Sequence, residues 1–408
     1  MKCRHCQAEL KLSLIDLGTA PPSNAYLNQQ TLHAPEKYFP LRVLVCTECW
    51  LVQTEDYAGV DELFPADYAY FSSFSTTWLK HAEKYVTDMV HRFALNAKSH
   101  IVEVAANDGY LLQYAKAQGI PCLGIEPTTS TAEAARAKGI EILGAFFGVD
   151  LAQQLAAQGR QADLTSANNV LAHVPDINDF VGGFAVLLKP AGVSTFEFPH
   201  LLRLVTENQF DTIYHEHYSY LSLTAVKRIF ERSGLSVFDV EELPTHGGSL
   251  RVYAQRKDSG VRGISQSVAK LLERETAAGM NNTAFYAGFQ AKANKVKNDL
   301  LMLLIETQRA GKTVAGYGAA AKGNTLLNYA GVRPDLLPYV VDRNPAKQDK
   351  FLPGCRIPIF AEAQLKQNRP DYVVILPWNI RTEVVEQLAY IREWGGQFVT
   401  AVPSLKVS

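Results

Sequence analysis

The stretch Ile101-Val102-Glu103-Val104-Ala105-Ala106-Asn107-Asp108-Gly109 decides the fold, because an apolar run passes abruptly into small and polar residues. Residues 101–105 predict a buried strand, and the turn that ends at Gly109 leads into a helix expected at 110–118. A strand, a tight turn and a helix N-terminus bring free backbone N–H groups and a positive dipole end together. The stretch therefore predicts an α/β unit with a ligand at the carboxyl end of its strand.

The same alternation continues along the chain after this turn. It ends in a strand pair joined by Leu243-Pro244-Thr245-His246-Gly247. Alternating strands and helices predict a doubly wound sheet, and a terminal hairpin is typical of a class I methyltransferase sheet. The other expected elements are helices at 75–93 and 130–138 and strands at 122–126, 162–169, 192–198, 236–241 and 248–256.

Composition indicates a folded protein with more than one domain. The 408 residues are 47% hydrophobic and 20% charged, the profile of a globular chain too long for one ordinary core. The formal net charge is −1, so no overall field attracts nucleic acid or anionic lipid. The first residues lack the apolar core of a signal peptide, and no run of about 18 apolar residues occurs. We expect a cytoplasmic protein that binds neither nucleic acid nor membrane.

The cysteines are concentrated near the N-terminus, where Cys3 and Cys6 form one Cys-x-x-Cys pair and Cys46 and Cys49 form another. Thiolates at this spacing can close a tetrahedral zinc site, and redox cysteines are the alternative. A disulfide framework would need an oxidising compartment, which nothing else in the sequence supports. Because four thiolates leave no open coordination position, we expect a structural zinc in a module that needs the metal for stability. Residues between the two cysteines of a pair, such as His5, are expected to be exposed to solvent.

The C-terminal part of the chain repeats the α/β pattern. An apolar stripe from Phe289 to Leu304 predicts a packing helix between two domains. The run Gly316-Tyr317-Gly318-Ala319-Ala320-Ala321-Lys322-Gly323 follows a strand expected at 313–316. Its small residues and Lys322 suit a diphosphate at a helix N-terminus, and a tight connection without a ligand is the alternative. Further strands are expected at 339–341, 372–376 and 397–401, with Asp342 placed where a nucleoside hydroxyl could bind.

The first turn suits a different ligand. It is not Gly-x-Gly-x-x-Gly, which argues against a dinucleotide. Glu103 and Asp108 suit a cationic amino-acid group better than a pyrophosphate, and Glu126 can accept hydrogen bonds from ribose hydroxyls. A zwitterionic nucleoside with a sulfonium group meets these requirements, so S-adenosylmethionine is the expected cofactor. A structural turn with an incidental acid is the alternative.

Acid–base chemistry is concentrated in Tyr214-His215-Glu216-His217-Tyr218. Imidazole is the usual side chain for proton abstraction near neutral pH, and an adjacent carboxylate can orient it. Periodicity does not say which histidine faces the ligand, and a satisfied core histidine is the alternative for each. His173, in Asn168-Asn169-Val170-Leu171-Ala172-His173, follows a predicted strand and could donate a hydrogen bond to a developing oxyanion.

Taken together, these motifs resemble those of the sugar 3-C-methyltransferases, which act on nucleotide-linked 4-keto-deoxy sugars. The resemblance runs nearly the whole length of the chain, with the motifs in the same order. They are the Cys-x-x-Cys pairs, the turn 103–109, the stretch 168–173, the stretch 214–218, His246-Gly247-Gly248-Ser249-Leu250-Arg251 and the turn 316–323.

The resemblance implies an α/β architecture, in which a class I methyltransferase sheet is flanked by a zinc-binding module and a Rossmann-like domain. The implied segments are a zinc-binding domain at 1–70, an S-adenosylmethionine-binding methyltransferase domain at 71–256, a helical connector at 257–310 and a Rossmann-like nucleotide-sugar-binding domain at 311–408. The implied partner is a nucleotide-diphosphate 4-keto-deoxy sugar.

The resemblance and the chemistry of the residues together suggest individual roles. His217, the second histidine of its motif, would be the general base, and Glu216, Tyr214 and His173 would complete the catalytic set. The cofactor would contact Tyr68, Tyr70, Glu103, Ala105, Asn107, Asp108, Gly109, Leu111, Glu126, Pro127, Phe146, Phe147, Asn168 and Asn169. The substrate would contact His246, Gly247, Gly248, Ser249, Arg251, Tyr317, Gly318, Ala319, Ala320, Lys322, Asn324 and Asp342.

The expected reaction is methyl transfer from S-adenosylmethionine to C3 of a nucleotide-linked 4-keto-6-deoxy sugar. A hydrogen on C3 is acidic beside a C4 ketone because its conjugate base is an enolate, and His217 would remove it. Methylation of an oxygen or a nitrogen is the first alternative. An NAD-dependent sugar oxidoreductase is the second, although Ala321 stands where the dinucleotide fingerprint has its third glycine. The neutral charge disfavours a zinc-ribbon nucleic-acid-binding protein.

Overall fold

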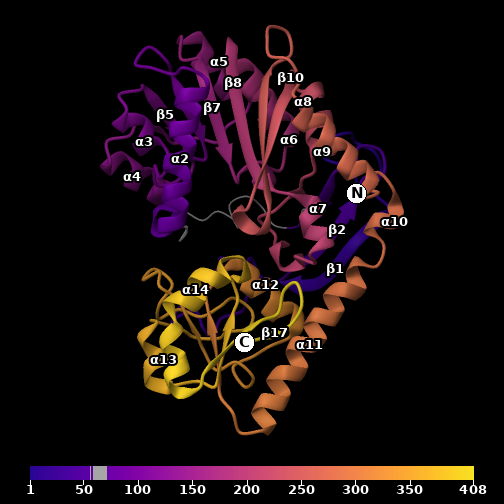
Figure 1. The fold of residues 1–408 in the computed structure, drawn as a ribbon, viewed down its shortest axis with the longest axis vertical. Coiled ribbons are helices and arrows are strands. Elements are labelled where there is room, and N and C mark those ends of the chain that lie inside the picture. Colours follow the sequence, from indigo (N-terminus) through magenta and orange to yellow (C-terminus); the bar gives the residue numbers. More distant parts are fainter. Residues whose placement is uncertain (56, 58–70) are drawn as a thin grey trace.

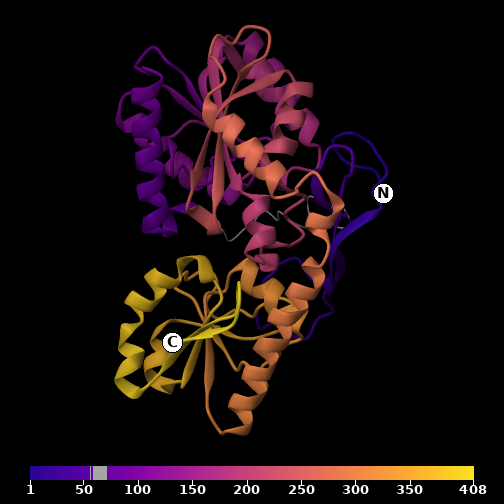
Figure 2. The same ribbon diagram turned by 45° about the vertical axis from the view of Figure 1, so that its right-hand side comes forward.

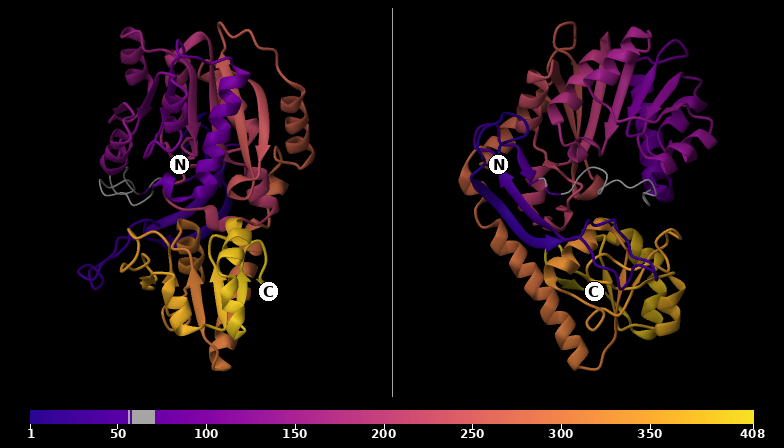
Figure 3. Two further views of the ribbon diagram at one scale, coloured as in Figure 1. Left: turned by 60° about the vertical axis from the view of Figure 1, so that its left-hand side comes forward. Right: turned by 180° about the vertical axis from the view of Figure 1, so that it is seen from behind.

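The computed structural model describes residues 1–55, 57 and 71–408. Over these residues the strands form three sheets, of four, seven and six strands. Figure 1 shows two lobes, with the seven-stranded sheet in the upper lobe and the six-stranded sheet in the lower one. The N-terminal strands lie at the junction of the lobes, in this view and from behind (Figure 3).

The seven-stranded sheet has the strand order β10-β11-β8-β7-β4-β5-β6. Neighbouring strands from β8 to β6 are parallel, whereas β11 is antiparallel to both β8 and β10. This order confirms the expected class I methyltransferase sheet with its terminal hairpin. Its strands are β4 (Ile101–Val104), β5 (Cys122–Ile125), β6 (Ile142–Leu143), β7 (Ala162–Asn168), β8 (Leu188–Pro199), β10 (Leu235–Leu243) and β11 (Ser249–Arg256).

Helices cover both faces of this sheet (Figure 2). One hydrophobic core joins α2, α3 and α4 to the sheet, and a second joins α5, α6 and α8 to its other face. Helices were expected from the sequence at the positions of α2 to α4, but no range was assigned to α5, α6 or α8. The helices of this lobe are α2 (Thr76–Arg92), α3 (Leu112–Ala117), α4 (Thr129–Ala137), α5 (Val149–Ala157), α6 (Ile177–Leu187), α7 (Leu201–Thr206) and α8 (Leu223–Arg232).

Short 3₁₀ helices form several connections of the upper lobe and contain parts of the expected motifs, including His173 in η2 and His246 in η4. They are η1 (Ser72–Phe74), η2 (Leu171–His173), η3 (Phe210–Thr212) and η4 (Thr245–Gly247).

The four-stranded sheet joins the N-terminal module to the middle of the chain. Its order is β1-β2-β3-β9, and β3 pairs with β9 through Val52 and Tyr220. Because β9 follows the motif 214–218 directly, this pairing holds the motif against the N-terminal module. The strands are β1 (Leu12–Ala20), β2 (Phe39–Val45), β3 (Val52–Thr54) and β9 (Ser219–Tyr220).

The six-stranded sheet of the lower lobe has the order β14-β13-β12-β15-β16-β17, parallel except for β17. Its strands are β12 (Val314–Tyr317), β13 (Val340–Val341), β14 (Ile359–Phe360), β15 (Tyr372–Ile375), β16 (Gln397–Thr400) and β17 (Lys406–Val407). Its helices are α12 (Ala321–Ala330), α13 (Ala363–Asn368), η5 (Trp378–Ile380), α14 (Arg381–Gln387) and η6 (Ala389–Trp394).

Between the lobes, the chain runs through α9 (Gln266–Ala277), α10 (Thr283–Tyr286) and α11 (Phe289–Arg309). Helix α11 extends along the lower lobe and packs on β1 and α12, which confirms the packing helix expected there. The carboxylate of Glu275 on α9 is buried in the upper lobe, where His200 and the backbone N–H groups of Leu223 and Thr224 donate to it. These hydrogen bonds of Glu275 anchor α9, the first helix of the connector, to the upper lobe. Among the described residues, no helix is both long and apolar enough to cross a membrane.

Candidate active site and metal centre

A cavity of about 490 Å³ lies where the lobes and the N-terminal module meet. Its wall combines the first turn, the 214–217 motif and the second turn, which are far apart in the sequence. The structure therefore brings half of the expected catalytic, cofactor and substrate residues into one space. Those on the wall are Ala105, Asn107, Glu126, Pro127, Phe146, Phe147, Asn168, Asn169, His173, Tyr214, Glu216, His217, His246, Ala320 and Lys322.

The first turn is held in an unusual backbone conformation. Ala105 and Asn107 have φ values of 60° and 47°, in the left-handed region that residues other than glycine rarely adopt. The carboxylate of Glu126 holds the turn, since its Oε2 accepts from the Asn107 backbone N–H at 2.9 Å. Its Oε1 accepts from the backbone N–H of Thr128 at 2.9 Å. Strained backbone of this kind is typical of ligand sites.

Buried acceptors on the wall give a test of whether the expected cofactor fits. Within the described part of the chain, neither Asn168 Oδ1 nor Asn169 Oδ1 has a hydrogen-bond partner. Each carboxylate oxygen of Glu126 also keeps a free lone pair beside its backbone bond. Acceptors at the carboxyl ends of β5 and β7 suit the ammonium and ribose hydroxyls of S-adenosylmethionine, so the residues fit this cofactor.

Several expected cofactor residues lie behind the wall rather than on it. Glu103 is buried beneath the turn, and burial raises its pKa well above the ordinary value. Asp108 faces away, toward the Lys138 ammonium at 3.4 Å and the Ser73 backbone N–H at 3.3 Å. Gly109 and Leu111 are also absent from the wall of this cavity. Tyr68 and Tyr70 lie outside the described residues.

The tertiary structure separates the two histidines of the 214–218 motif. His215 Nε2 donates to the Phe39 carbonyl at 3.2 Å, so this ring anchors the motif to β2. His217 lines the cavity, and its Nδ1–H donates to the Thr212 carbonyl at 2.9 Å. The lone pair of the neutral ring is therefore on Nε2, which accepts from the Tyr214 hydroxyl at 2.7 Å.

The imidazoles at the cavity are neutral near pH 7. Burial, together with the nearby His173, lowers the pKa of His217 well below its ordinary value. Burial also lowers the pKa of His173 and of His246 to about 4. The His173 and His217 rings are 4.6 Å apart between centroids, in an edge-on arrangement. Two neutral imidazoles therefore lie next to each other on the cavity wall.

The lower lobe adds a cationic corner to the cavity. The Lys322 ammonium donates to Asn379 Oδ1 at 3.0 Å and lies 4.7 Å from the centroid of the Trp378 ring. Burial lowers the pKa of Lys322 to about 8, although Asp211 opposes this shift. The Trp378 indole N–H donates to Asp211 Oδ2 at 2.7 Å, which ties η5 to the upper lobe.

Substitution of Asp211 by asparagine should remove part of the pH dependence of stability. Burial raises the pKa of this carboxyl from 3.8 to about 6, against the opposing effects of Lys322 and Trp378. Between these values the folded state binds more protons than the unfolded state, so its stability falls as pH rises through this window. We expect Asp211→Asn to reduce the decline in unfolding free energy between pH 4 and 6 by about 2–3 kcal/mol. Equal declines in denaturant titrations of both proteins would contradict this.

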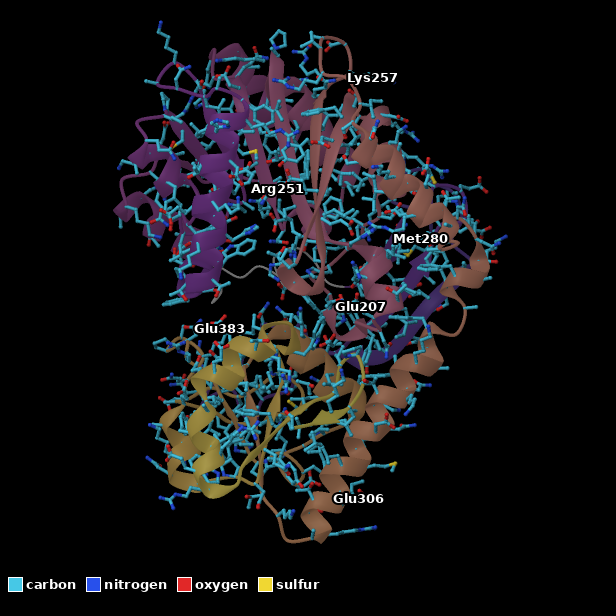
Figure 4. The ribbon with its side chains drawn as sticks, viewed as in Figure 1. Glu207, Arg251, Lys257, Met280, Glu306 and Glu383 are labelled. Carbon is cyan, nitrogen blue, oxygen red and sulfur yellow. The ribbon has the colours of Figure 1, made fainter. Side chains whose placement is uncertain are left out.

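Other expected substrate residues do not reach the wall. Arg251 is buried within the upper lobe (Figure 4), where its guanidinium donates to Glu197 Oε2 at 3.0 Å. Asp342 Oδ2 accepts from the backbone N–H of Ala319 at 2.7 Å and so holds the second turn in place. A Cβ at Gly318 would lie 2.5 Å from Pro377 Cδ, so this glycine permits a close approach of two loops. The remaining residues off the wall are Gly247, Gly248, Ser249, Tyr317, Ala319 and Asn324.

The cavity also includes residues that sequence reasoning missed. Thr128, Pro377 and Asn379 follow the parallel strands β5 and β15, so their position at the ends of predicted strands was a usable signal. Nothing local in the sequence marks Asn24 or Lys347. The missed wall residues are Asn24, Ser72, Trp78, Tyr110, Thr128, Ala145, Val170, Ala172, Val174, Phe180, Pro199, Thr212, Ala321, Lys347, Pro377, Asn379 and Ile380, together with Val104 and Ile125.

The four N-terminal cysteines form a second centre. The sulfur atoms of Cys3, Cys6, Cys46 and Cys49 all lie within 4.8 Å of one another. A tetrahedral zinc with bonds of about 2.3 Å requires sulfur separations of about 3.8 Å, so this cluster fits the metal. The expectation for His5 is wrong, because this ring is buried and lies 2.7 Å from Asn178 Oδ1 on α6.

Comparisons with known proteins agree with this arrangement. The sequence matches zinc-binding domains over residues 3–64, methyltransferase domains over 78–240 and the C-methyltransferase C-terminal domain over 244–403. It is 34% identical over 406 residues to the C-methyltransferase NovU of Streptomyces niveus, and the match covers 100% of this chain and 96% of that protein.

Solved structures resemble part of the chain more distantly. A methyltransferase dependent on S-adenosylmethionine from Clostridium acetobutylicum is 11% identical with a TM-score of 0.36, covering 44% of this chain and 92% of that one. Magnesium protoporphyrin IX methyltransferase from Synechocystis PCC 6803, with bound SAM, is 16% identical with a TM-score of 0.34, covering 44% and 79%.

Proposed function

Because the chain belongs to the family of C-methyltransferases that depend on S-adenosylmethionine and carry an N-terminal zinc-binding domain, we propose that it methylates C3 of a nucleotide-linked 4-keto-6-deoxy sugar. His217 is the general base of this reaction. The proposal rests above all on one observation, that the first turn, the His217 ring and Lys322 share one cavity. The division of the chain at 1–70, 71–256, 257–310 and 311–408 belongs to the same proposal.

The chemistry requires a base and a carbon acid held in contact with the methyl donor. A C4 ketone acidifies the hydrogen on C3, because removal of that hydrogen gives an enolate with its charge on oxygen. S-adenosylmethionine, when bound, supplies an electrophilic methyl group. Holding the reacting carbon and the donor at contact distance contributes much of the acceleration.

The hydrogen-bond pattern of His217 suits proton abstraction. The Thr212 carbonyl fixes the tautomer, so the lone pair is on Nε2. The Tyr214 hydroxyl donates to the same nitrogen, so the proton either replaces this bond or passes through the tyrosine oxygen. An imidazolium in this buried place is costly when alone, but the enolate formed beside it would stabilise its charge. The base is thus matched to an anionic intermediate.

Donors on the wall can stabilise the developing oxyanion. His173 lies edge-on to His217 and is neutral near pH 7, with its ring bonded to the Glu216 backbone carbonyl. To stabilise the oxyanion, its N–H would exchange this carbonyl for the ketone oxygen beside the carbon that His217 deprotonates. The Lys322 ammonium and the N-terminus of α12 are the lower lobe's part of the wall, where the diphosphate of the nucleotide binds.

The deciding experiment incubates the full-length enzyme with thymidine, guanosine and cytidine diphosphate-linked 4-keto-6-deoxy sugars in deuterated water, with and without S-adenosylmethionine. We expect one nucleotide sugar to gain a methyl group by mass spectrometry and to lose its C3 proton signal by NMR. The reaction without the methyl donor should exchange that proton for deuterium.

Each of the other outcomes contradicts a separate part of the proposal. A methyl group on C5 would overturn the position, because the C4 ketone acidifies both of its neighbours. A methyl group on oxygen or nitrogen without exchange would overturn the enolate route. If no sugar is methylated or exchanged, the substrate class is wrong.

A further inference from the structure

The acid–base motif is held in place by the N-terminal module. Strand β9, which follows the motif, pairs with β3, and the Thr54 hydroxyl donates to the His217 carbonyl at 3.1 Å. His215 is bonded to the Phe39 carbonyl at the start of β2. The backbone on both sides of Glu216 is therefore fixed by residues that lie more than a hundred positions earlier in the chain.

The same module also reaches the motif with a side chain. The Asn24 amide Nδ2 donates to Glu216 Oε1 at 2.6 Å, and both residues line the cavity. Only 1% of the surface of Glu216 is exposed, so few water molecules can orient this carboxylate. A charge-assisted hydrogen bond in a buried place is strong and directional, so Asn24 helps to orient Glu216 Oε1.

Asn24 belongs to a strap, residues 21–38, that leaves β1 and crosses onto the lower lobe. The Tyr26 hydroxyl donates to the Ala319 carbonyl in the second turn at 2.6 Å. Leu27 and Phe351 exchange backbone hydrogen bonds of 3.0 and 2.8 Å. The strap thus touches Glu216 and the second turn within three residues of sequence.

We propose that Asn24 is a positioning residue, which holds the Glu216 carboxylate in the orientation that faces the sugar, so that the N-terminal module completes the active site. This inference rests on the proposed function, because that function places the sugar against Glu216. It assigns the strap a role that differs from the metal centre of the same module. The zinc stabilises the module, whereas Asn24 acts on the reacting groups through Glu216.

An isosteric substitution separates positioning from mere packing. Asn24→Asp would place a second carboxylate at hydrogen-bond distance from Glu216 Oε1. Two carboxylates at this distance share one proton at low pH and repel each other once both are ionised. The titratable groups near the pair are Tyr26 on the strap, Lys347 and Asp342 on the lower lobe, and His173 and His217 beside Glu216 on the cavity wall.

The test compares Asn24→Ala and Asn24→Asp with the wild-type enzyme, using the nucleotide sugar that the wild-type methylates. We expect Asn24→Ala to lower kcat about 10–100-fold, the range for loss of a hydrogen bond to a charged group. S-adenosylmethionine affinity, measured by calorimetry, should change less than about twofold. The kcat of Asn24→Asp relative to wild-type should fall about tenfold or more as the pH rises through the ionisation of the second carboxylate.

The matched control is Asn28→Ala, which lies on the same strap and accepts hydrogen bonds only from its own turn among the residues described. It should keep wild-type kcat. A wild-type kcat in Asn24→Ala would overturn the inference, and so would an Asn24→Asp ratio that does not vary with pH. If Asn24→Ala lowers cofactor affinity and melting temperature as well as kcat, Asn24 only stabilises the fold and does not position Glu216. If the wild-type methylates no sugar of the panel, the proposed function is wrong, and this inference is wrong as well because it rests on that function.

Discussion

The His217→Ala variant is expected to lose about 10³-fold in kcat while it keeps its affinity for S-adenosylmethionine. The bond from Nδ1 to the Thr212 carbonyl leaves the lone pair of this ring on Nε2, beside the Tyr214 hydroxyl on the cavity wall, so the substitution deletes the base. Cofactor affinity should persist, because the acceptors that suit the cofactor lie at the ends of β5 and β7. Steady-state kinetics and calorimetry measure the two quantities, and deuterium exchange at C3 should fall by the same factor as kcat.

His215→Ala is the matched control, since this ring belongs to the same motif but bonds to the Phe39 carbonyl outside the cavity. It should lower the melting temperature and retain most of the turnover. Equal losses of kcat in both variants would show that the motif acts only through packing. Because burial lowers the pKa of His217 well below 6.5, the base stays deprotonated, and kcat/KM of the wild-type should not fall between pH 8 and pH 6 through this group.

Loss of the zinc should produce the largest effect on stability. Binding of zinc to four thiolates is worth about 10–16 kcal/mol in small domains, and much of this energy is folding energy. We expect Cys46→Ser to lower the unfolding free energy by about 5 kcal/mol or more and to reduce bound zinc well below one equivalent. Turnover should fall too, because β3 begins just after Cys49 and pairs with the strand that follows the motif. Elemental analysis and thermal unfolding measure these changes.

Cys122→Ser provides the control, since Cys122 lies on β5 outside the metal cluster. It should retain a full equivalent of zinc. If Cys46→Ser unfolds at the wild-type temperature, the cluster does not stabilise the chain through a metal. Chelation of wild-type protein should reproduce the variant, and restoration of stability by added zinc would separate metal loss from damage by the substitution itself.

Local signals in the sequence were sufficient for much of the architecture. The strand at 101–105, the hairpin ending at 256 and the packing helix beginning at Phe289 were all expected, because strand, turn and helix preferences act over a few neighbours. The pairing of β3 with β9 was not expected. It joins segments about 170 residues apart in sequence, and a two-residue strand has no periodicity of its own to detect.

The candidate site likewise combines features that local sequence predicts with features that depend on long-range packing. Residue types alone indicate which chemistry is available: two Cys-x-x-Cys pairs, an acid at the end of β5, and imidazoles beside a carboxylate. Which of these groups meet depends on how the chain packs. It turned His217 into the cavity and His215 out of it, buried Arg251 against Glu197, and brought Asn24 to Glu216. The physical reason is that residue type fixes what a side chain can do, whereas its direction and partners depend on packing between distant segments.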